Sequence, residues 1–442
     1  MEQIDEAQPG TLRRTLSGWD LVVYGMLFIG ITAPMGTFGI LDARSGGATP
    51  LVFLIAALAM GATAYSYARM SHAVPKAGSV YAYAEAGLGQ KPAFLAGWML
   101  TLDYLFIPSM ALLFMGVALN ALVPAIPVWV ITVAGVAVIT LLNLLGVRLA
   151  ARVGVVMLAI EIVLLSVFIV AAIVFLRVHG PTRPWLSPIV GVDGFNLSGV
   201  LGASTVAALA FLGFDAIASF AEETTGSTRQ VGRALAVCLA VAAVLFIVQT
   251  YLASLLESYS PAELAANPAL QGSAFYDMLG ASVGGWLKFP ITLMRSIGPI
   301  FSALVAQAAA SRLIFAMGRG RDLPSALGTV DATEGVPRNA TLLSAVITLV
   351  VSTVAALAPA GLETLSSMVT VGALVAFIFL HLATIGFYGV RRGEGWRAAV
   401  IPVIGILITF ALLVDASRLA LGIAAVWAML AIAVLVARGI RR

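Results

Sequence analysis

The sequence predicts an all-α integral membrane protein. Of its 442 residues, 61% are apolar and only 10% are charged, whereas soluble domains carry about 25% charged residues. Several stretches reach the roughly 20 apolar residues that a helix needs to cross the hydrocarbon layer, and the short alternating segments of a membrane β-barrel are missing. This composition excludes a soluble enzyme and a nucleic-acid-binding protein. A disulfide scaffold is also excluded, because the single cysteine, Cys238, can form no internal disulfide.

The apolar stretches divide into twelve predicted spans. Pro124 and Pro127 separate the third span from the fourth. The twelve spans cover residues 18–41, 50–68, 92–122, 128–147, 153–176, 198–220, 233–257, 286–317, 338–357, 363–389, 398–414 and 418–437. The connecting segments are short, so we expect a single transmembrane domain over residues 1–442. Residues 1–17 are polar and form the expected N-terminal segment, with no cleavable signal peptide.

The placement of Lys and Arg predicts the orientation of the chain. Segments on the side of the N-terminus hold nineteen of the 25 basic residues, and segments on the opposite side hold four. Because basic residues collect on the cytoplasmic side of membrane proteins, we expect both termini to be cytoplasmic. This asymmetry also explains the net charge of +4 without any nucleic-acid partner.

The first and sixth spans contain residues that interrupt helices. Residues 28–39 combine three glycines with Pro34, and residues 210–216 place Gly213 beside the charged Asp215. Secondary transporters commonly break one helix at the same place in each of two inverted repeats, although Gly and Pro are also frequent in ordinary membrane helices. The breaks are five spans apart, which predicts two five-span repeats and two further helices, over residues 18–176, 198–389 and 398–437.

Four ionisable residues lie well inside predicted spans: Asp103, Glu161, Asp215 and Arg295. Each costs at least about 2.5–3.5 kcal/mol at the bilayer centre, so each is a candidate functional residue. A structural alternative is that Asp215 pairs with Arg295 or that Glu161 is neutral and inert. Three acids against one base leave two acids unpaired, and desolvated carboxyl groups can exchange protons near neutral pH. The set therefore predicts proton coupling.

Other polar residues carry weaker signals. Glu222 and Glu223 follow the sixth span and fit either a gate closed by arginines or a solvated helix end, which we favour slightly. His381 in the tenth span is expected to be a hydrogen-bonded packing residue. No metal-ligand spacing, phosphate loop or nucleophile motif occurs, so we predict neither a cofactor nor a metal.

Several motifs together resemble the amino acid–polyamine–organocation (APC) superfamily of permeases, and within it the bacterial putrescine importers. The resemblance runs through nearly the whole chain. Its most specific motifs are residues 76–83 (KAGSVYAY), 102–108 (LDYLFIP), 120–129 (NALVPAIPVW), 211–215 (FLGFD), 222–224 (EET), 312–319 (RLIFAMGR) and 372–377 (GALVAF). It implies a LeuT-like transporter with twelve helices, a five-plus-five inverted repeat and alternating access.

The resemblance also implies where a substrate binds. The site would lie between spans 1, 3, 6, 8 and 10, with Asp103 or Asp215 meeting an amine and with Glu161 and Asp103 coupling transport to protons. The expected substrate-binding residues are Gly30, Thr32, Ala33, Met35, Gly36, Asp103, Tyr104, Phe211, Gly213, Phe214, Asp215 and Arg295.

Three positions depart from the putrescine importers. The putrescine importers look to carry an acidic residue where this chain has Gly36 and an uncharged Gln where this chain has Glu161. Arg295 has no recognised counterpart in them. These changes weaken a strict putrescine interpretation. They leave open a zwitterionic amino acid, whose carboxylate would meet free amides in the first span or Arg295.

The resulting hypothesis is a proton-coupled importer of an amine-bearing metabolite, either an amino acid or a polyamine, in a bacterial inner membrane. The expected partners are this small molecule, protons and membrane lipid. An exchanger that swaps an amino acid for its amine product is an alternative that the sequence does not separate from it. Sodium coupling through Ser302 and Thr292 stays open but is less favoured than proton coupling. A membrane enzyme is disfavoured, because no catalytic constellation is visible.

Overall fold

The computed structural model describes residues 12–440 except 193, 228, 332–334, 359, 360, 415 and 417. The first half contains α1 (Gly18–Ile29), α2 (Ala33–Ser45), α3 (Thr49–Ala73), α4 (Val80–Leu88), α5 (Gln90–Tyr104), α6 (Phe106–Leu122), α7 (Val128–Leu144), α8 (Val147–His179), α9 (Ser187–Val190), α10 (Leu197–Leu209) and the 3₁₀ helix η1 (Phe214–Glu223). The first eleven residues of the predicted N-terminal segment lie outside the described part.

The second half is also helical. It contains α11 (Arg229–Leu256), α12 (Pro261–Ala266), α13 (Pro268–Gln271), α14 (Ala274–Ser282), α15 (Gly285–Ile297), α16 (Pro299–Arg319), η2 (Ser325–Gly328), α17 (Arg338–Leu357), α18 (Gly361–Thr384), η3 (Ile385–Arg391), η4 (Trp396–Ala398), α19 (Val400–Val414) and α20 (Arg418–Ile440). The described residues form no β-strand, only an isolated bridge between Leu16 and Thr224.

Each predicted interval contains at least one helix. Ten described helical segments are long and apolar enough to cross a membrane, and the bent pair α1–α2 makes an eleventh. The shorter apolar helix α7 occupies the remaining predicted interval. The third and eighth spans, predicted as single helices, are each divided in two, α5–α6 and α15–α16. Pro299 begins α16, because proline fits the first turn of a helix but not its interior.

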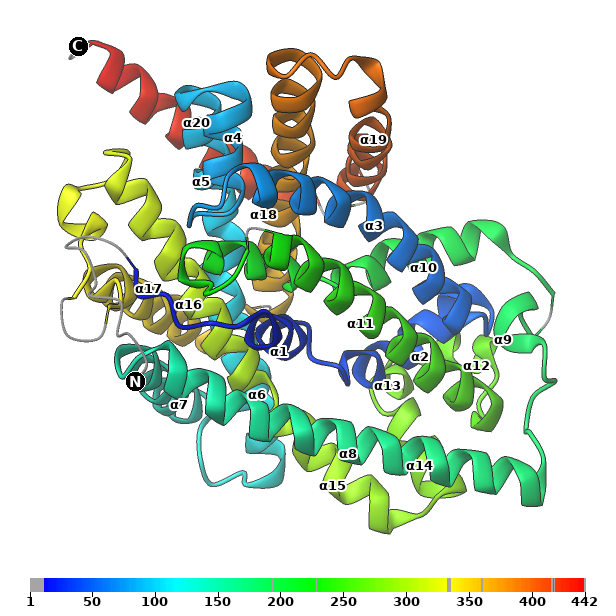
Figure 1. Ribbon diagram of the computed structural model, residues 1–442. Helices are drawn as coiled ribbons and strands as arrows, with labels where there is room; N and C mark the ends of the chain where they lie inside the picture. The colour runs from blue at the N-terminus through cyan, green and yellow to red at the C-terminus, as the bar shows by residue number, and fades with distance from the viewer. Residues whose placement is uncertain are drawn as a thin grey trace.

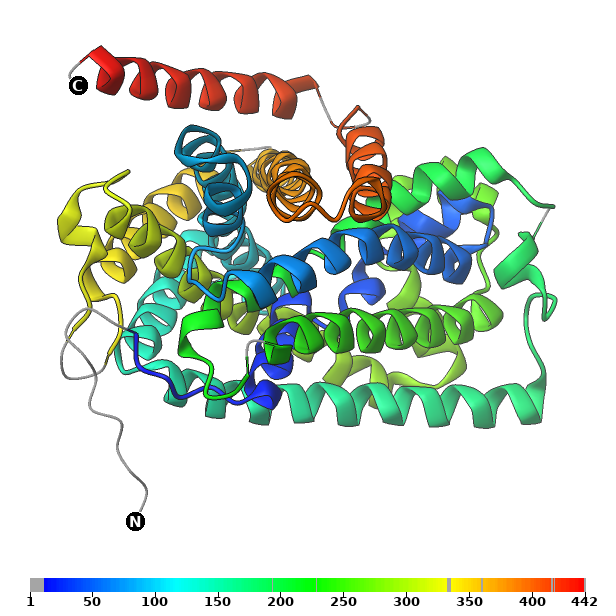
Figure 2. The same ribbon diagram turned by 45° about the horizontal axis from the view of Figure 1, so that its top comes forward.

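The helices differ in how much of their surface the protein covers. In the segment formed by α15 and α16, 83% of the most apolar 18-residue stretch is buried inside the protein, against 17% of the corresponding stretch in α20. Figure 2 shows α8 and α20 along opposite edges of the molecule. Exposed apolar side chains on such peripheral helices are what contact with lipid requires. The segments near the centre, visible in Figure 1, are those that can carry a site.

Two helix breaks lie side by side at the centre. The axes of α1 and α2 differ by 46°, and the chain turns at Gly30 with φ of 70°. The second break follows α10, where Gly213 has φ of 109°, a conformation that glycine adopts without strain. A Cβ on Gly213 would lie only 2.7 Å from the Phe28 ring, so glycine is required for the two breaks to touch.

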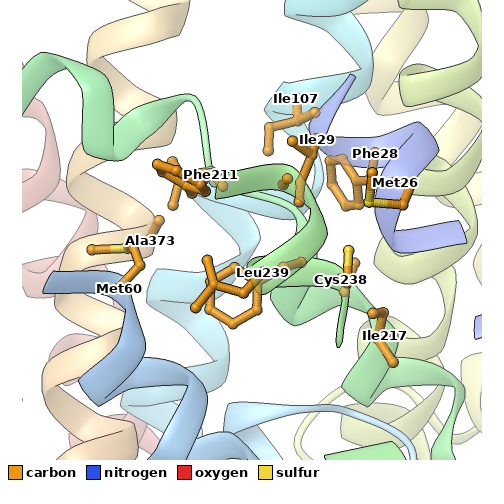
Figure 3. Close-up of a cluster of buried hydrophobic side chains, with 14 of the residues drawn as sticks. Met26, Phe28, Ile29, Met60, Ile107, Phe211, Ile217, Cys238, Leu239 and Ala373 are labelled. Carbon is orange, nitrogen blue, oxygen red and sulfur yellow. The ribbon is translucent and has the colours of Figure 1, made fainter. Parts of the chain in front are cut away.

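The unwound segments are held by polar side chains and by apolar packing. The Gln249 side chain donates to the carbonyl of Ile31 over 3.0 Å, and Ser302 donates to that of Leu27 over 2.7 Å. These bonds satisfy carbonyls near the end of α1. Figure 3 shows side chains of α1, including Met26 and Phe28, converging with Phe211 and Ile217 from the sixth span.

Candidate functional site

A buried carboxylate stands at the second helix break. Asp215, in the first turn of η1, is 0% exposed. One of its oxygens accepts a hydrogen bond from the backbone N–H of Gly213 over 3.1 Å. The other accepts from the hydroxyl of Tyr104 over 2.8 Å and from that of Tyr67 over 3.4 Å. Asp215 therefore binds neutral donors from three segments, and the expected alternative of a pair with Arg295 is not what the structure contains.

A second carboxylate, Asp103, lies next to this group at the C-terminal end of α5. Its side chain is 1% exposed, and its Oδ1 atom has no hydrogen-bond partner. Asp103 is close enough to Asp215 for the two charges to interact. Gly372 lets α18 pack closely against α5 at this point, because a Cβ on Gly372 would lie 3.0 Å from the backbone nitrogen of Asp103. Two buried acids without a basic partner can be satisfied by a cation or by protons.

Two residues around the acids were missed by sequence reasoning. The Ser79 hydroxyl lies 3.3 Å from that of Tyr104 and 3.5 Å from that of Tyr67. Ser79 is one of two non-glycine residues in the described part with positive φ, at 50°, a conformation that costs energy and clusters at functional sites. Ser79 belongs to the motif at 76–83, which was the one available signal; Tyr67 carried none.

The other residues expected at the site line the two breaks in different ways. Gly30 directly follows α1, Thr32 directly precedes α2, and Ala33 begins α2, while Met35 is buried in the first turn of α2. The aromatic residues face apolar neighbours. The ring of Phe211 packs against Phe53 and Phe246, and that of Phe214 packs against Tyr67.

A second charged group brings together Gly36, Glu161 and Arg295. The guanidinium of Arg295, on α15, approaches α2 so closely that a Cβ on Gly36 would lie 3.0 Å from Nη2. Glu161 of α8 is 5% exposed, and its Oε1 lies 3.0 Å from where a Cβ of Gly298 would stand. Both Glu161 Oε2 and Arg295 Nε are buried without a hydrogen-bond partner.

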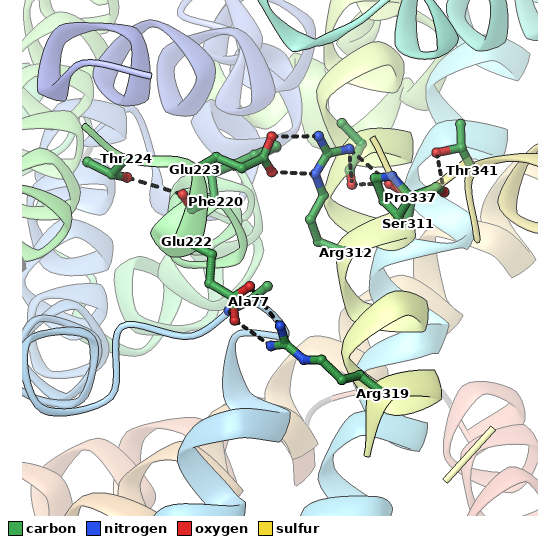
Figure 4. A network of polar contacts seen from close by, with 11 residues as sticks. Ala77, Phe220, Glu222, Glu223, Thr224, Ser311, Arg312, Arg319, Pro337 and Thr341 are labelled. Carbon is green, nitrogen blue, oxygen red and sulfur yellow. Dashed lines mark hydrogen bonds and ion pairs between the residues drawn. The ribbon is translucent and has the colours of Figure 1, made fainter. Parts of the chain in front are cut away.

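Figure 4 shows two ion pairs, which join the last residues of η1 to α16. Glu223 accepts from Nε and Nη2 of Arg312 over 2.7 and 2.9 Å, and both side chains are at most 2% exposed. Glu222 accepts from the backbone N–H of Ala77 over 3.0 Å and pairs with Arg319. The favoured expectation of a solvated helix end is therefore wrong. The arginines come from α16, and their bonds offset the cost of burying the carboxylates.

A third cluster lies at the opposite end of the helices. Arg183 donates to both carboxylate oxygens of Asp42 over 3.1 and 2.8 Å, which ties the loop after α8 to the last turn of α2. Glu257, directly after α11, accepts from the backbone N–H of Tyr259 over 2.9 Å, while its other oxygen is buried and unpartnered. Burial raises the pKa of Glu257 to about 7. Sequence reasoning did not single out this cluster.

The remaining polar candidates have local partners. As expected for a packing residue, His381 lies 2.9 Å from the hydroxyl of Ser66 and 3.4 Å from that of Thr63. The two hydroxyls considered for sodium, Ser302 and Thr292, both donate to backbone carbonyls. Among the described residues, no group of three or more His, Cys, Asp or Glu side chains could hold a metal ion.

Comparisons with known proteins identify the family of the chain. The profile of the family described as amino acid permease matches residues 22–437. The low-affinity putrescine importer PlaP of Escherichia coli (strain K12) is 29% identical over 431 residues, which cover 94% of this chain and 92% of that protein. The branched-chain amino acid permease BcaP of Lactococcus lactis subsp. cremoris is 30% identical, covering 78% of this chain and 74% of its own length. The vacuolar cationic amino acid transporter 4 of Arabidopsis thaliana is 27% identical, covering 84% and 62%.

Proposed function

Because the chain belongs to the amino acid permease family of the APC superfamily, and is thus a multi-pass membrane transporter and not an enzyme, we propose that it imports an amine-bearing metabolite. The substrate class is an amino acid or a polyamine such as putrescine. The relatives support this class, since they are named for putrescine, branched-chain amino acids and cationic amino acids.

The observation that carries the proposal is the unpaired carboxylate of Asp103 beside Asp215. Asp215 is already held by Tyr104, Tyr67 and the Gly213 amide, whereas Asp103 Oδ1 has no donor. A protonated substrate amine supplies the missing donor and a compensating charge, and a hydrogen bond between charged groups is stronger than one between neutral groups. The ring of Tyr104 offers a further cation–π contact.

Transport by alternating access is part of the same proposal. The chain would cross the membrane twelve times, with inverted repeats over residues 18–176 and 198–389, helices 11 and 12 over 398–437, and both termini in the cytoplasm of a bacterium. The adjoining breaks after α1 and α10 support it, since carriers commonly break one helix in each repeat. The ion pairs of Glu223 and Glu222 with arginines of α16 would form the cytoplasmic gate.

Proton coupling is proposed to use Glu161, together with Asp103. Glu161 is buried, lies in the apolar helix α8 and makes no ion pair in the described part of the chain. Such a carboxyl group can exchange a proton as its surroundings change. The alternative is exchange of an amino acid for its amine product. Uptake into vesicles that contain no internal substrate separates the two, because only the proton-coupled importer supports it.

The proposal is tested with Asp103→Asn in proteoliposomes that carry a proton gradient. Uptake of radiolabelled putrescine and leucine should fall by roughly 10- to 100-fold, because a charge-assisted hydrogen bond is lost. Asp277→Asn is the matched control, since the side chain of Asp277 is 36% exposed and already pairs with Lys288. The variant should elute and melt like the parent. Near-normal uptake by Asp103→Asn would remove Asp103 from the site.

A further inference from the structure

Arg295 gives this carrier a second recognition group. We infer that its guanidinium binds a carboxylate of the substrate above Gly36 of α2, so that the protein selects amino acids over the corresponding carboxylate-free amines. This inference rests on the proposed function and narrows its substrate class.

The first step is that Arg295 has no anionic partner in the described part of the chain. It lies in α15, inside a segment apolar enough to span the membrane. Its Nε–H group is buried and donates to no acceptor in the described part of the chain. An arginine in such a position is costly and is retained where it serves a function. By contrast, the buried Arg183 and Arg312 each bind a carboxylate with two nitrogens.

The second step concerns the space beside α2. A Cβ on Gly36 would lie 3.0 Å from Arg295 Nη2 and 3.9 Å from its Cζ. A longer side chain at position 36 would therefore occupy the place of the guanidinium. Gly36 lies in the second turn after the helix break at Gly30–Thr32, and the N-terminal end of α2 adds a favourable potential for anions. Glycine here lets a cationic group face the break.

The third step is the position of the nearest opposite charge. Glu161 of α8 is within electrostatic range of Arg295, yet no ion pair joins them, and Glu161 Oε2 is buried and unpartnered. The carboxylate is held against Gly298, one turn beyond Arg295. The guanidinium thus keeps its donors available, and its planar fork matches a carboxylate with two parallel hydrogen bonds.

Together these contacts assign the two ends of a substrate to different groups. The amine belongs to Asp103 beside Asp215, and the carboxylate belongs to Arg295. A diamine such as putrescine presents a second cation to Arg295 in place of an anion, and like charges repel. The wild-type protein should therefore bind an amino acid roughly 10- to 100-fold more tightly than its decarboxylated amine.

The test uses two pairs of ligands that differ only by a carboxylate: ornithine with putrescine, and leucine with isoamylamine. Affinities are measured by calorimetry on the detergent-purified full chain, and uptake is measured in proteoliposomes. Arg295→Gln should lower affinity for ornithine and leucine roughly 10- to 100-fold while leaving or improving that for the two amines. Arg295→Lys, which keeps the charge but loses the fork, should fall between. Lys288→Gln, on the same helix in an exposed ion pair, should change none of the four affinities.

Each outcome is decisive. Equal affinities within both pairs in the wild type, or equal losses for both members of a pair in Arg295→Gln, would overturn the inference and leave the proposed function standing. Binding of none of the four compounds would overturn the proposed function, and the inference with it. If Arg295→Gln does not fold, Arg295→Lys carries the comparison, and an unchanged preference in that variant counts against a bidentate site.

Discussion

Replacing Glu257 with glutamine should stabilise the protein at alkaline pH and remove part of its pH dependence. Glu257 follows α11, outside the membrane-spanning segment, and its side chain is fully buried. Burial is the main cause that raises its pKa from 4.5 to about 7, while the amide of Tyr259 and the charge of Arg183 oppose the rise. Glutamine keeps the acceptor for the Tyr259 amide but carries no charge.

The sign and size of the effect follow from this shift. The unfolded chain releases the proton of Glu257 near pH 4.5, whereas the folded chain retains it up to about pH 7. The stabilising contribution is therefore complete below pH 4.5 and is lost as the pH rises through 7. A difference of this size corresponds to about 3 kcal/mol of unfolding free energy. The advantage of Glu257→Gln should be absent near pH 4.5 and reach its full value at pH 8.

The assay is thermal melting of detergent-purified protein at pH 5, 6, 7 and 8, comparing Glu257→Gln with the wild type. Glu263→Gln is the control, because Glu263 is fully exposed and its pKa is lowered by hydrogen bonds from Ser260. That variant should gain nothing as the pH rises. If the melting curves of Glu257→Gln and the wild type shift in parallel over this range, the buried carboxyl does not titrate as argued.

Two further predictions concern packing between distant segments. Arg312→Met should destabilise the protein by about 3–5 kcal/mol, because it leaves the Glu223 carboxylate buried without its cation. In a double-mutant cycle, adding Glu223→Gln should restore part of this loss. Strictly additive losses from the two substitutions would contradict direct coupling between Arg312 and Glu223. Trp427→Phe should cost about 1 kcal/mol in the same melting assay, since the Nε1 atoms of Trp98 and Trp427 each donate to the other's carbonyl over 3.0 Å. Trp286→Phe should cost less, because Trp286 is exposed and its Nε1 donates to the carbonyl of Val283, only three residues before it.

The helices and the central breaks were predictable because their causes are local. About 20 consecutive apolar residues predict a membrane helix wherever they occur, and Pro34 and Gly213 mark breaks that the structure contains. The division of the eighth span at Pro299 was missed, since an apolar run through a proline still has the composition of one helix. A proline thus marked the break in the first span but left the break in the eighth span unrecognised.

Side-chain partners were less predictable, because they come from residues far apart in the chain. Glu223 is followed by polar residues in the sequence and was expected to be solvated, yet it meets Arg312, 89 positions away. The ring of Phe211, which is expected at the substrate site, packs against Phe53 and Phe246, two partners that its position in the sequence did not indicate. A helix end or an aromatic ring looks the same in sequence whether its partner is protein, lipid or water.

Buried charges of the described chain differ in whether the protein itself satisfies them. Glu223 lies shortly before α11 in the chain and binds Arg312. Near the other end of α11, Asp42 binds Arg183. Both pairs are buried and bidentate, so the protein itself satisfies them. Asp103, Glu161 and Arg295, and also Glu257 beside the Asp42–Arg183 pair, each keep a buried atom without a partner. Groups that the protein leaves unsatisfied can gain binding energy from an incoming ligand, whereas satisfied pairs can only lose by being separated. An incoming charged ligand can therefore gain binding energy at Asp103, Glu161 and Arg295, whereas separating the pairs Glu223–Arg312 and Asp42–Arg183 costs energy.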